Sequence, residues 1–430
     1  MISKLRVSDY NFIFPDFGAD GDSSALVYNS RSGAMAVLDE KSFSVFNALK
    51  DGGQPIQDKE LEEGFIHCGF LIEDQINEKN ELRLQMYRSR FASSQLALVI
   101  APSMNCNFQC PYCFEKGNLH SRHMTDEVAD KITEFVTEQA SQLSHLEITW
   151  FGGEPLLDIP RIESLSNEFT RLCRKNNIEY KSDIVTNGYI YTPDTARLLK
   201  GCSISSVQIT IDGAKETHDK RRFLQTGTGT FDTIIKNLKA TKGILPVALR
   251  INIDSTNMEE TGEVLSLLKS EELEVFVKPY LGHVERYNDS CTGSCLTKKQ
   301  FSEYSFRFIQ DIGRSIEKNF PEPKGNCCFA DSSNAWVIDP FGDMYKCYLD
   351  IGDKTKKIYS LIEENDKPTK LLNDYMLFDP TTHPRCGTCK LLPLCMGGCP
   401  AMLLSEKDSC AKFKHTLNEY ITSCARAVMA

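Results

Sequence analysis

The stretch that decides the fold is Ser94–Phe114, SQLALVIAPSMNCNFQCPYCF, in which an apolar run leads into three closely spaced cysteines. The run predicts a strand over Ser94–Ala101. Cys106, Cys110 and Cys113 follow it with the spacing Cys-x3-Cys-x2-Cys. Because active sites of parallel α/β sheets gather in the loops after the strands, this loop is the first candidate for a functional site.

Strand–helix alternation continues from this strand to about residue 280. The predicted strands are Ser94–Ala101, His145–Phe151, Tyr180–Thr186, Ile204–Ile211, Pro246–Ile253 and Glu274–Pro279. The helices predicted between them are Asp126–Gln142, Ile159–Lys175, Pro193–Lys200, Thr230–Lys242 and Glu259–Lys269. This order predicts an α/β fold with a parallel sheet that is either open or partly rolled into a barrel, and we expect a partial (β/α)6 barrel of the TIM type.

The chain is predicted to have four parts. Residues 1–90 read as a small winged-helix-like module of short strands and two helices, Asp39–Leu49 and Asp58–Phe70, with the polar stretch Asp74–Arg90 as its linker. Residues 91–285 form the partial barrel. Residues 286–324 bridge it, through a helix at Lys298–Lys318, to a loop-rich, cysteine-rich region over 325–430.

Composition excludes several classes of protein. A hydrophobic fraction of 41% and a charged fraction of 25% over 430 residues are ordinary for a globular chain, which excludes overall disorder. A net charge of −10 argues against a nucleic-acid partner. Apolar runs such as Leu96–Pro102 are far shorter than the roughly 20 residues of a membrane span. No apolar core follows Met1–Val7, so we expect no signal peptide and a cytoplasmic protein.

The 17 cysteines carry the functional signal. In a long chain without an export signal, thiols are expected to stay reduced, and reduced cysteines at short spacing indicate metal or cluster ligation. Three thiolates on one loop leave one position of a tetrahedral or cubane centre open, which is typical of a catalytic centre. Iron–sulfur clusters are held by such thiolates. A zinc site that takes a distant fourth ligand is the alternative.

The cysteine spacing after the first strand, with Tyr112 before the last cysteine, resembles the radical S-adenosylmethionine (SAM) superfamily. The resemblance implies that Cys106, Cys110 and Cys113 hold a 4Fe–4S cluster whose open iron chelates the amino and carboxylate groups of SAM. An electron from the cluster then cleaves SAM, and the 5′-deoxyadenosyl radical takes a hydrogen atom from the substrate. The cofactors supply this chemistry, whereas the protein positions them and excludes water.

The resemblance also implies which loops bind SAM. The second strand ends in Trp150–Pro155, WFGGEP, and the family pattern assigns this segment to the SAM amino group, with glycines that let backbone approach a ligand closely. The family pattern His-Asp-x-x-Arg selects Arg222 over Arg221 for the SAM carboxylate, which suits a guanidinium. The implied cofactor-binding residues are Tyr112, Gly152, Gly153, Glu154, Asn187, Asp212 and Arg222. No catalytic residue is assigned.

The carboxy-terminal cysteines resemble the seven-cysteine SPASM domain of radical SAM enzymes that modify peptides and proteins. The resemblance implies two auxiliary 4Fe–4S clusters, so three in all. One would be held by Cys386, Cys389, Cys395 and Cys410, and the other by Cys328, Cys347 and Cys399. The fourth ligand of the latter stays open between Cys327, Cys291, Cys295 and none. Zinc remains the alternative for the Cys-x2-Cys knuckle.

Residues 1–90 resemble the peptide-recognition element of enzymes that mature ribosomally made peptides, which adds the leader peptide as an extra strand. The leading hypothesis is therefore a radical SAM peptide maturase that forms a thioether or C–C crosslink in a precursor peptide and takes electrons from a flavodoxin or ferredoxin. One alternative is an anaerobic sulfatase-maturating enzyme that makes formylglycine, although Tyr348 replaces the aspartate that follows the equivalent of Cys347 there. The other is a non-enzymatic, zinc-stabilised binding protein.

Overall fold

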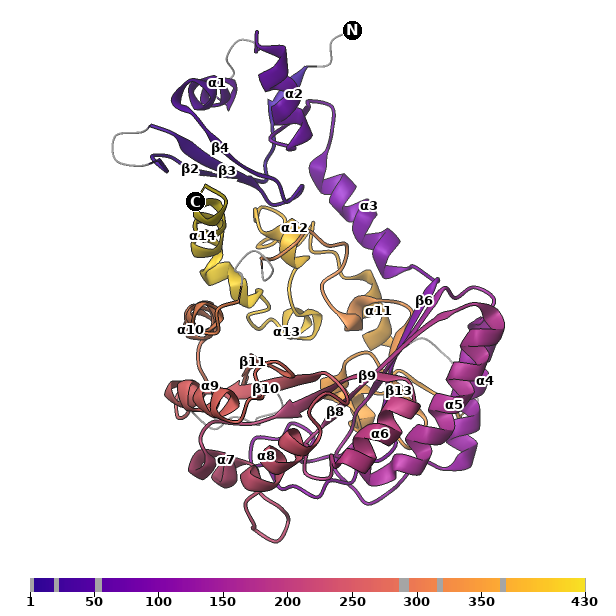
Figure 1. The fold of residues 1–430 in the computed structure, drawn as a ribbon. Helices are drawn as coiled ribbons and strands as arrows, with labels where there is room; N and C mark the ends of the chain where they lie inside the picture. Colours follow the sequence, from indigo (N-terminus) through magenta and orange to yellow (C-terminus); the bar gives the residue numbers. More distant parts are fainter. Residues whose placement is uncertain are drawn as a thin grey trace. The chain divides into compact units, whose positions relative to one another are not determined.

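The computed structural model describes residues 4–18, 23–50, 56–285, 294–314, 320–363 and 369–429, and Figure 1 shows its elements. The chain forms two compact units. The first unit comprises Met1–Phe91, Lys298–Asp331 and Leu377–Ala430, and the second comprises Ala92–Thr297 and Ser332–Met376. These units do not follow the predicted domain boundaries, because the cysteine-rich region is divided between them.

The second unit is built on one sheet, which has nine strands within the described residues, in the order β11-β10-β9-β8-β7-β6-β12-β13-β14. All six predicted strands are present and run parallel, which confirms the predicted α/β class. They are β6 (Gln95–Ile100), β7 (His145–Trp150), β8 (Glu179–Thr186), β9 (Ile204–Thr210), β10 (Val247–Ile253) and β11 (Val277–His283). The parallel register brings their carboxyl ends to one edge of the sheet.

Helices pack the apolar side of this sheet (Figure 1). In β7, Leu146, Ile148 and Trp150 are fully buried, whereas the residues between them face the other side. Burial of each such apolar side chain contributes about 1.5–3 kcal/mol to the free energy of unfolding. The predicted helices are found as α4 (Asp126–Gln139), α5 (Ile159–Asn176), α6 (Pro193–Gly201), α8 (Phe231–Ala240) and α9 (Thr261–Ser270).

Two features of this unit were not predicted. A helix, α7 (Lys215–Arg221), follows β9, and residues 332–376 extend the barrel sheet instead of joining the rest of the cysteine-rich region. The added strands are β12 (Ala335–Ile338), β13 (Asp343–Tyr345) and β14 (Tyr359–Ser360). Because β12 is buried throughout and pairs in parallel with β6, the predicted boundary at residue 325 falls short of where the chain divides.

The first unit contains a small antiparallel sheet of β2 (Asn11–Phe14), β3 (Ala25–Asn29) and β4 (Met35–Leu38). Helices α1 (Glu40–Lys50) and α2 (Lys59–His67) follow, and a strand pair joins β1 (Leu5–Val7) to β5 (Leu71–Glu73). One core of the module contains Val27, Leu38, Phe46, Phe65, Phe70 and Leu71. These strands and helices lie close to where the sequence predicts them.

The amino-terminal module is not separate from the cysteine-rich region. All five residues of β3 are buried, because its second face packs on the carboxy-terminal segment. That shared core contains Leu26, Tyr28, Leu391, Leu394, Leu417, Ile421 and Ala425. The predicted linker is also wrong: residues 78–90 form helix α3 (Glu78–Arg90), whose Leu82 packs against Leu392.

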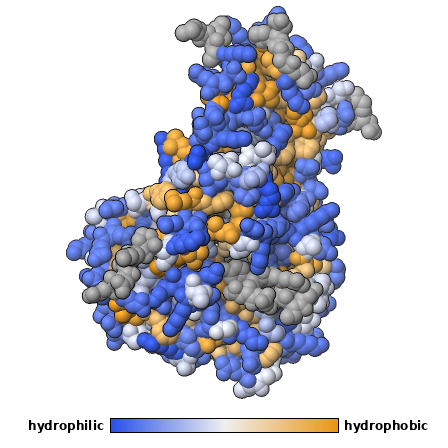
Figure 2. Space-filling model, turned by 180° about the vertical axis from the view of Figure 1, so that it is seen from behind, coloured by the Kyte–Doolittle hydropathy of each residue, from blue (hydrophilic) through white to orange (hydrophobic). Residues whose placement is uncertain are grey.

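The remaining α-helices of the described chain have between 4 and 14 residues. They are α10 (Lys298–Asp311), α11 (Lys370–Leu377), α12 (Leu392–Cys395), α13 (Pro400–Leu404) and α14 (Leu417–Met429). No helix among the described residues is long and apolar enough to cross a membrane. The face shown in Figure 2 is mainly hydrophilic with smaller apolar areas, and the exposed large apolar side chains of the chain include Leu84, Phe91 and Val275.

Candidate active site and cysteine centres

The loop after β6 brings its three cysteines to one cavity. Cys106, Cys110 and Cys113 line a cavity of about 460 Å³ together with Gly153 and Gln225. The segment after α7 holds this loop in place, because the backbone N–H of Gln109 donates to the Phe223 carbonyl (2.9 Å) and that of Gln225 to the Asn107 carbonyl (3.0 Å). The predicted thiol trio is therefore assembled by contacts between segments more than 100 residues apart.

The thiols fit a cluster that displaces their protons. Burial raises the pKa of Cys106 and Cys113 to about 12, and it raises the pKa of Cys110. Because the ligand form is the thiolate, these cysteines need a metal centre to ionise at neutral pH. The backbone N–H of Phe108 already donates to Cys106 Sγ at 3.4 Å. Among the described residues, no three His, Cys, Asp or Glu side chains lie in a geometry that would hold a single metal ion.

The Gly-Gly-Glu segment after β7 supports the cysteine loop. A Cβ at Gly152 would clash with the Ser103 carbonyl, and a Cβ at Gly153 would clash with the Asn105 carbonyl. Gly152 also has a φ of 101°, which disfavours other residues. The glycines are thus needed for close approach of the cysteine loop, a reason that differs from the predicted approach to a ligand.

Glu154 joins the ends of neighbouring strands. Its fully buried carboxylate accepts hydrogen bonds from the Leu156 N–H (3.0 Å), the Thr186 hydroxyl (2.7 Å) and the Asn187 N–H (2.7 Å). Burial outweighs these bonds and raises its pKa. Asn187 in turn donates from Nδ2 to Asn107 Oδ1 at 2.7 Å, which ties β8 to the cysteine loop. A direct contact of Glu154 or Asn187 with SAM stays a prediction.

Tyr112 is the centre of a buried polar network. Its hydroxyl donates to Asp212 and accepts from Arg222 Nη1 at 2.8 Å and from Asn252 Nδ2 at 3.3 Å. Burial raises the pKa of Tyr112, so the phenol stays protonated. Asn252 and Asp254, at the end of β10, were missed by the sequence analysis because no motif marks them.

The two adjacent arginines differ in their partners. Arg221 forms ion pairs with Asp212 (3.3 Å) and Asp254 (2.7 Å). Arg222 is 9% exposed, lies over the Phe108 ring and forms no ion pair with any described residue. Its Nε and Asp212 Oδ1 are buried without a hydrogen-bond partner. A direct contact of Arg222 with the SAM carboxylate stays a prediction.

The other two named residues of the His-Asp-x-x-Arg motif, His218 and Asp219, build the turn. His218 Nδ1 accepts from the Asp212 N–H (3.2 Å) and Nε2 contacts the Thr230 hydroxyl (3.0 Å). Burial lowers the pKa of His218 well below 6.5, so the imidazole is neutral. Asp219 Oδ1 accepts from the N–H groups of Thr230 and Phe231. Both side chains therefore have structural roles in placing Arg222.

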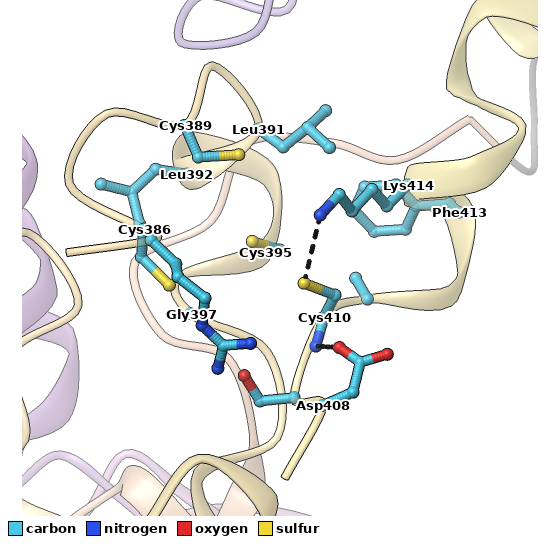
Figure 3. A pocket seen from close by; sticks show the side chains of 13 residues that line it. Cys386, Cys389, Leu391, Leu392, Cys395, Gly397, Asp408, Cys410, Phe413 and Lys414 are labelled. Atoms are coloured by element: carbon cyan, nitrogen blue, oxygen red, sulfur yellow. Dashed lines mark hydrogen bonds between the residues drawn. The ribbon is translucent and has the colours of Figure 1, made fainter. Parts of the chain in front are cut away.

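Four carboxy-terminal cysteines surround a second cavity. In the first unit, Cys386, Cys389, Cys395 and Cys410 line a pocket of about 140 Å³ (Figure 3). Burial raises the pKa of Cys395 to about 11, and the Gly397 N–H opposes this by bonding to its sulfur. Four thiols around one small cavity fit a fully ligated cluster, and they form the set that the SPASM resemblance implies.

Cys327 and Cys328 lie on a bent backbone. The Asp331 carboxylate accepts from the N–H groups of Cys327 (3.2 Å) and Cys328 (3.1 Å), and Arg90 lies 3.6 Å from the same carboxylate. Cys399 belongs to this unit, whereas Cys347 follows β13 in the other. Of the other candidate ligands, Cys291 lies outside the described residues and Cys295 is disulfide-bonded. The ligand set of this auxiliary cluster stays a prediction.

Comparison with known proteins finds relatives of this chain. Residues 100–268 match the family model described as "Radical SAM superfamily". Residues 100–268 therefore form a region similar to the radical SAM superfamily. The chain is 23% identical over 356 residues to a cysteine-type anaerobic sulfatase-maturating enzyme of Clostridium perfringens, which covers 76% of this chain and 94% of that one. It is 26% identical over 253 residues to the radical SAM cyclopropyl synthase TigE of Paramaledivibacter caminithermalis, covering 51% and 52%.

Solved structures of other proteins share the fold of this chain. The sulfatase-maturating enzyme anSMEcpe with bound AdoMet and Cp18Cys peptide matches with a TM-score of 0.58 and 20% identity, over 78% of this chain and 98% of that one. Streptococcus suis SuiB bound to the precursor peptide SuiA matches with a TM-score of 0.52 and 17% identity, over 96% and 99%. The second match extends over residues that precede and follow the barrel.

Proposed function

We propose that this radical SAM enzyme is a peptide maturase that forms a thioether or C–C crosslink in a ribosomally made precursor peptide. The observation that carries the proposal is the match to SuiB, which spans 96% of the chain, whereas the match to anSMEcpe spans 78%. An amino-terminal module, barrel and cysteine-rich region thus recur together in a protein whose structure was solved with a precursor peptide.

Named side chains would hold the cofactors. Cys106, Cys110 and Cys113 would hold a 4Fe–4S cluster, and Arg222 would bind the SAM carboxylate. When bound, cluster and SAM supply a 5′-deoxyadenosyl radical that takes hydrogen from the substrate. The chain keeps Tyr112 protonated and Arg222 charged, and it buries Arg222, so that the carboxylate would be bound largely away from water.

The cysteine-rich region is proposed to be a SPASM domain with two auxiliary clusters. Cys386, Cys389, Cys395 and Cys410 would hold one cluster. The other would be held by Cys328, Cys347, Cys399 and Cys327, whose turn is already bent around Asp331. A flavodoxin or ferredoxin is the proposed electron donor.

Residues 1–90 are proposed to bind the leader of the precursor peptide. Strand β4 (Met35–Leu38) is an edge strand of the three-stranded sheet and pairs only with β3 among the described residues. An edge strand offers unpaired N–H and C=O groups, to which an extended peptide adds as a further strand. The leader would take that place.

The decisive experiment measures SAM cleavage and iron together after anaerobic purification. Replacement of Cys106, Cys110 and Cys113 by alanine should abolish 5′-deoxyadenosine formation and remove about a third of the iron, since each of three clusters holds the same number of iron atoms. Cys173→Ala is the matched control, because that buried thiol lies outside every cavity described above. Continued SAM cleavage by the triple variant would refute the cluster assignment.

Sulfatase maturation is the second candidate, favoured by the match that covers 94% of the C. perfringens enzyme. Tyr348, which stands where that class carries an aspartate, is 42% exposed and packs edge-on against Phe151 at 5.9 Å. Mass spectrometry separates the two functions. A crosslink removes two hydrogens from a precursor peptide encoded near this chain, whereas formylglycine appears in a cysteine-containing sulfatase peptide.

A further inference from the structure

The pocket of the four carboxy-terminal cysteines has a cation directed at one of its sulfurs. Lys414, in the 3-10 helix Lys412–His415, lies four residues after Cys410. Its ammonium donates a hydrogen bond to Cys410 Sγ at 3.5 Å, and Figure 3 shows the side chain reaching across the pocket to that sulfur. A sulfur that accepts a hydrogen bond from an ammonium group donates less electron density to a bound metal.

The other charges around the pocket reinforce this cation. Arg385 also lines the pocket, so a second positive charge lies beside the four cysteines. Asp408 is the one carboxylate in the lining. Its Oδ1 accepts from the Cys410 N–H at 3.0 Å, and Lys298 Nζ lies 3.9 Å from its Oδ2, so its charge is partly compensated.

Charge and hydrogen bonding set the reduction potential of a cluster. A reduced cluster carries one more negative charge than the oxidised one, so a cation at a ligand sulfur stabilises the reduced form more. Because Lys414 is exposed, water screens part of this effect, and the direct hydrogen bond supplies most of what remains.

We propose that Lys414 is a positioning residue that raises the reduction potential of the cluster held by Cys386, Cys389, Cys395 and Cys410, through its hydrogen bond to Cys410 Sγ. The proposal rests on the proposed function, which places a cluster in this pocket. It concerns the potential at which the cluster takes up one electron, and SAM cleavage at the cysteine loop after β6 does not enter it.

The test is a redox titration followed by electron paramagnetic resonance, in a background in which Cys106, Cys110 and Cys113 are alanine so that only auxiliary clusters give signals. Lys414→Met should shift one couple to a more negative potential. We expect about a threefold lower reduced-to-oxidised ratio at a fixed applied potential, which is about 30 mV for one electron. Lys414→Arg, which keeps the charge and a donor, should restore most of the ratio.

Lys407→Met is the matched control, because this exposed lysine belongs to the same loop and has no contact with a sulfur among the described residues. An unchanged couple in Lys414→Met, or an equal shift in Lys407→Met, overturns the role of the hydrogen bond. Iron and sulfide analysis of Cys386→Ala and Cys410→Ala tests whether the pocket holds a cluster, independently of the effect of Lys414 on its potential. Unchanged iron in those variants overturns the proposed cluster itself. If Lys414→Met loses iron, the same titration is made on Lys414→Gln, which keeps a donor without the charge and should also shift negative.

Discussion

Single residues decide which side chains remain available for a cofactor. Arg221 and Arg222 are adjacent and chemically identical, but two carboxylates neutralise Arg221 whereas Arg222 has none within ion-pair distance among the described residues. Arg222 lies over the ring of Phe108, so its guanidinium lies beside the cysteine loop. A buried cation without a partner is costly unless a ligand supplies the anion.

We therefore expect Arg222→Met to weaken SAM binding. The loss of a charged hydrogen bond, about 1.5–3 kcal/mol, corresponds to roughly 10–100-fold in dissociation constant. Equilibrium dialysis of SAM against anaerobically reconstituted enzyme measures it. Arg174→Met, an exposed arginine of α5, should bind SAM as the unchanged enzyme does. Normal affinity in Arg222→Met would mean that another group binds the carboxylate.

Among the elements, helix α3 differs most from expectation. The sequence of residues 78–90 is so polar that it reads as a linker, yet the helix buries Leu82, Met86 and Arg90. Arg90 Nη1 donates to the Phe378 carbonyl at 2.6 Å, and Arg90 Nη2 lies 3.6 Å from the Asp331 carboxylate that holds the Cys327–Cys328 turn. One buried arginine thus connects the end of the helix to the candidate ligands.

Arg90→Met should destabilise the first unit by about 3–5 kcal/mol, because it leaves the buried Asp331 charge unpaired. Urea unfolding under anaerobic conditions measures the free energy, and iron analysis reports whether the cysteine turn still holds its cluster. Arg88→Met, two positions earlier and exposed, should change stability by less than about 0.5 kcal/mol. Equal stability of the two variants would contradict the role of the Arg90–Asp331 pair.

At the scale of the whole molecule, the first unit is assembled from three distant segments of the chain. Leu26 and Tyr28 of β3 share a core with Leu394 and Ile421, and Lys390 Nζ donates to the Asn11 carbonyl at 2.7 Å. The amino-terminal module is therefore part of the body that holds the cysteine pocket, and it is not an appendage that can be removed freely.

Removal of residues 1–91 should therefore impair the folding of the rest of the first unit in addition to leader binding. It would expose Leu391, Leu394, Leu417 and Ile421, each worth about 1.5–3 kcal/mol when buried. The shortened chain is expected to aggregate or to lose iron from the cysteine pocket. Leu394→Ala, a milder change, should lower the free energy of unfolding by about 2–5 kcal/mol. Leu404→Ala, at a 37% exposed position, should lower it much less. A shortened chain that is soluble and fully loaded with iron would contradict the shared core.

Much of the fold of this enzyme can be predicted from local sequence. The apolar runs and their spacing determine the six parallel strands, and Cys-x3-Cys-x2-Cys places three thiols on one loop, because strand and loop geometry depend on neighbours along the chain. The choice between Arg221 and Arg222 also follows from a motif, but its physical basis, the partners Asp212 and Asp254, does not.

Only the tertiary structure decides what distant segments do to one another. It makes residues 78–90 a helix, gives residues 332–376 to the barrel sheet and joins β3 to the carboxy-terminal core. It also places Asn252 on Tyr112 and Lys414 on Cys410. The physical reason is that burial and hydrogen bonding depend on which surfaces meet in space. The sequence pattern of a single segment does not specify which other segment it packs against.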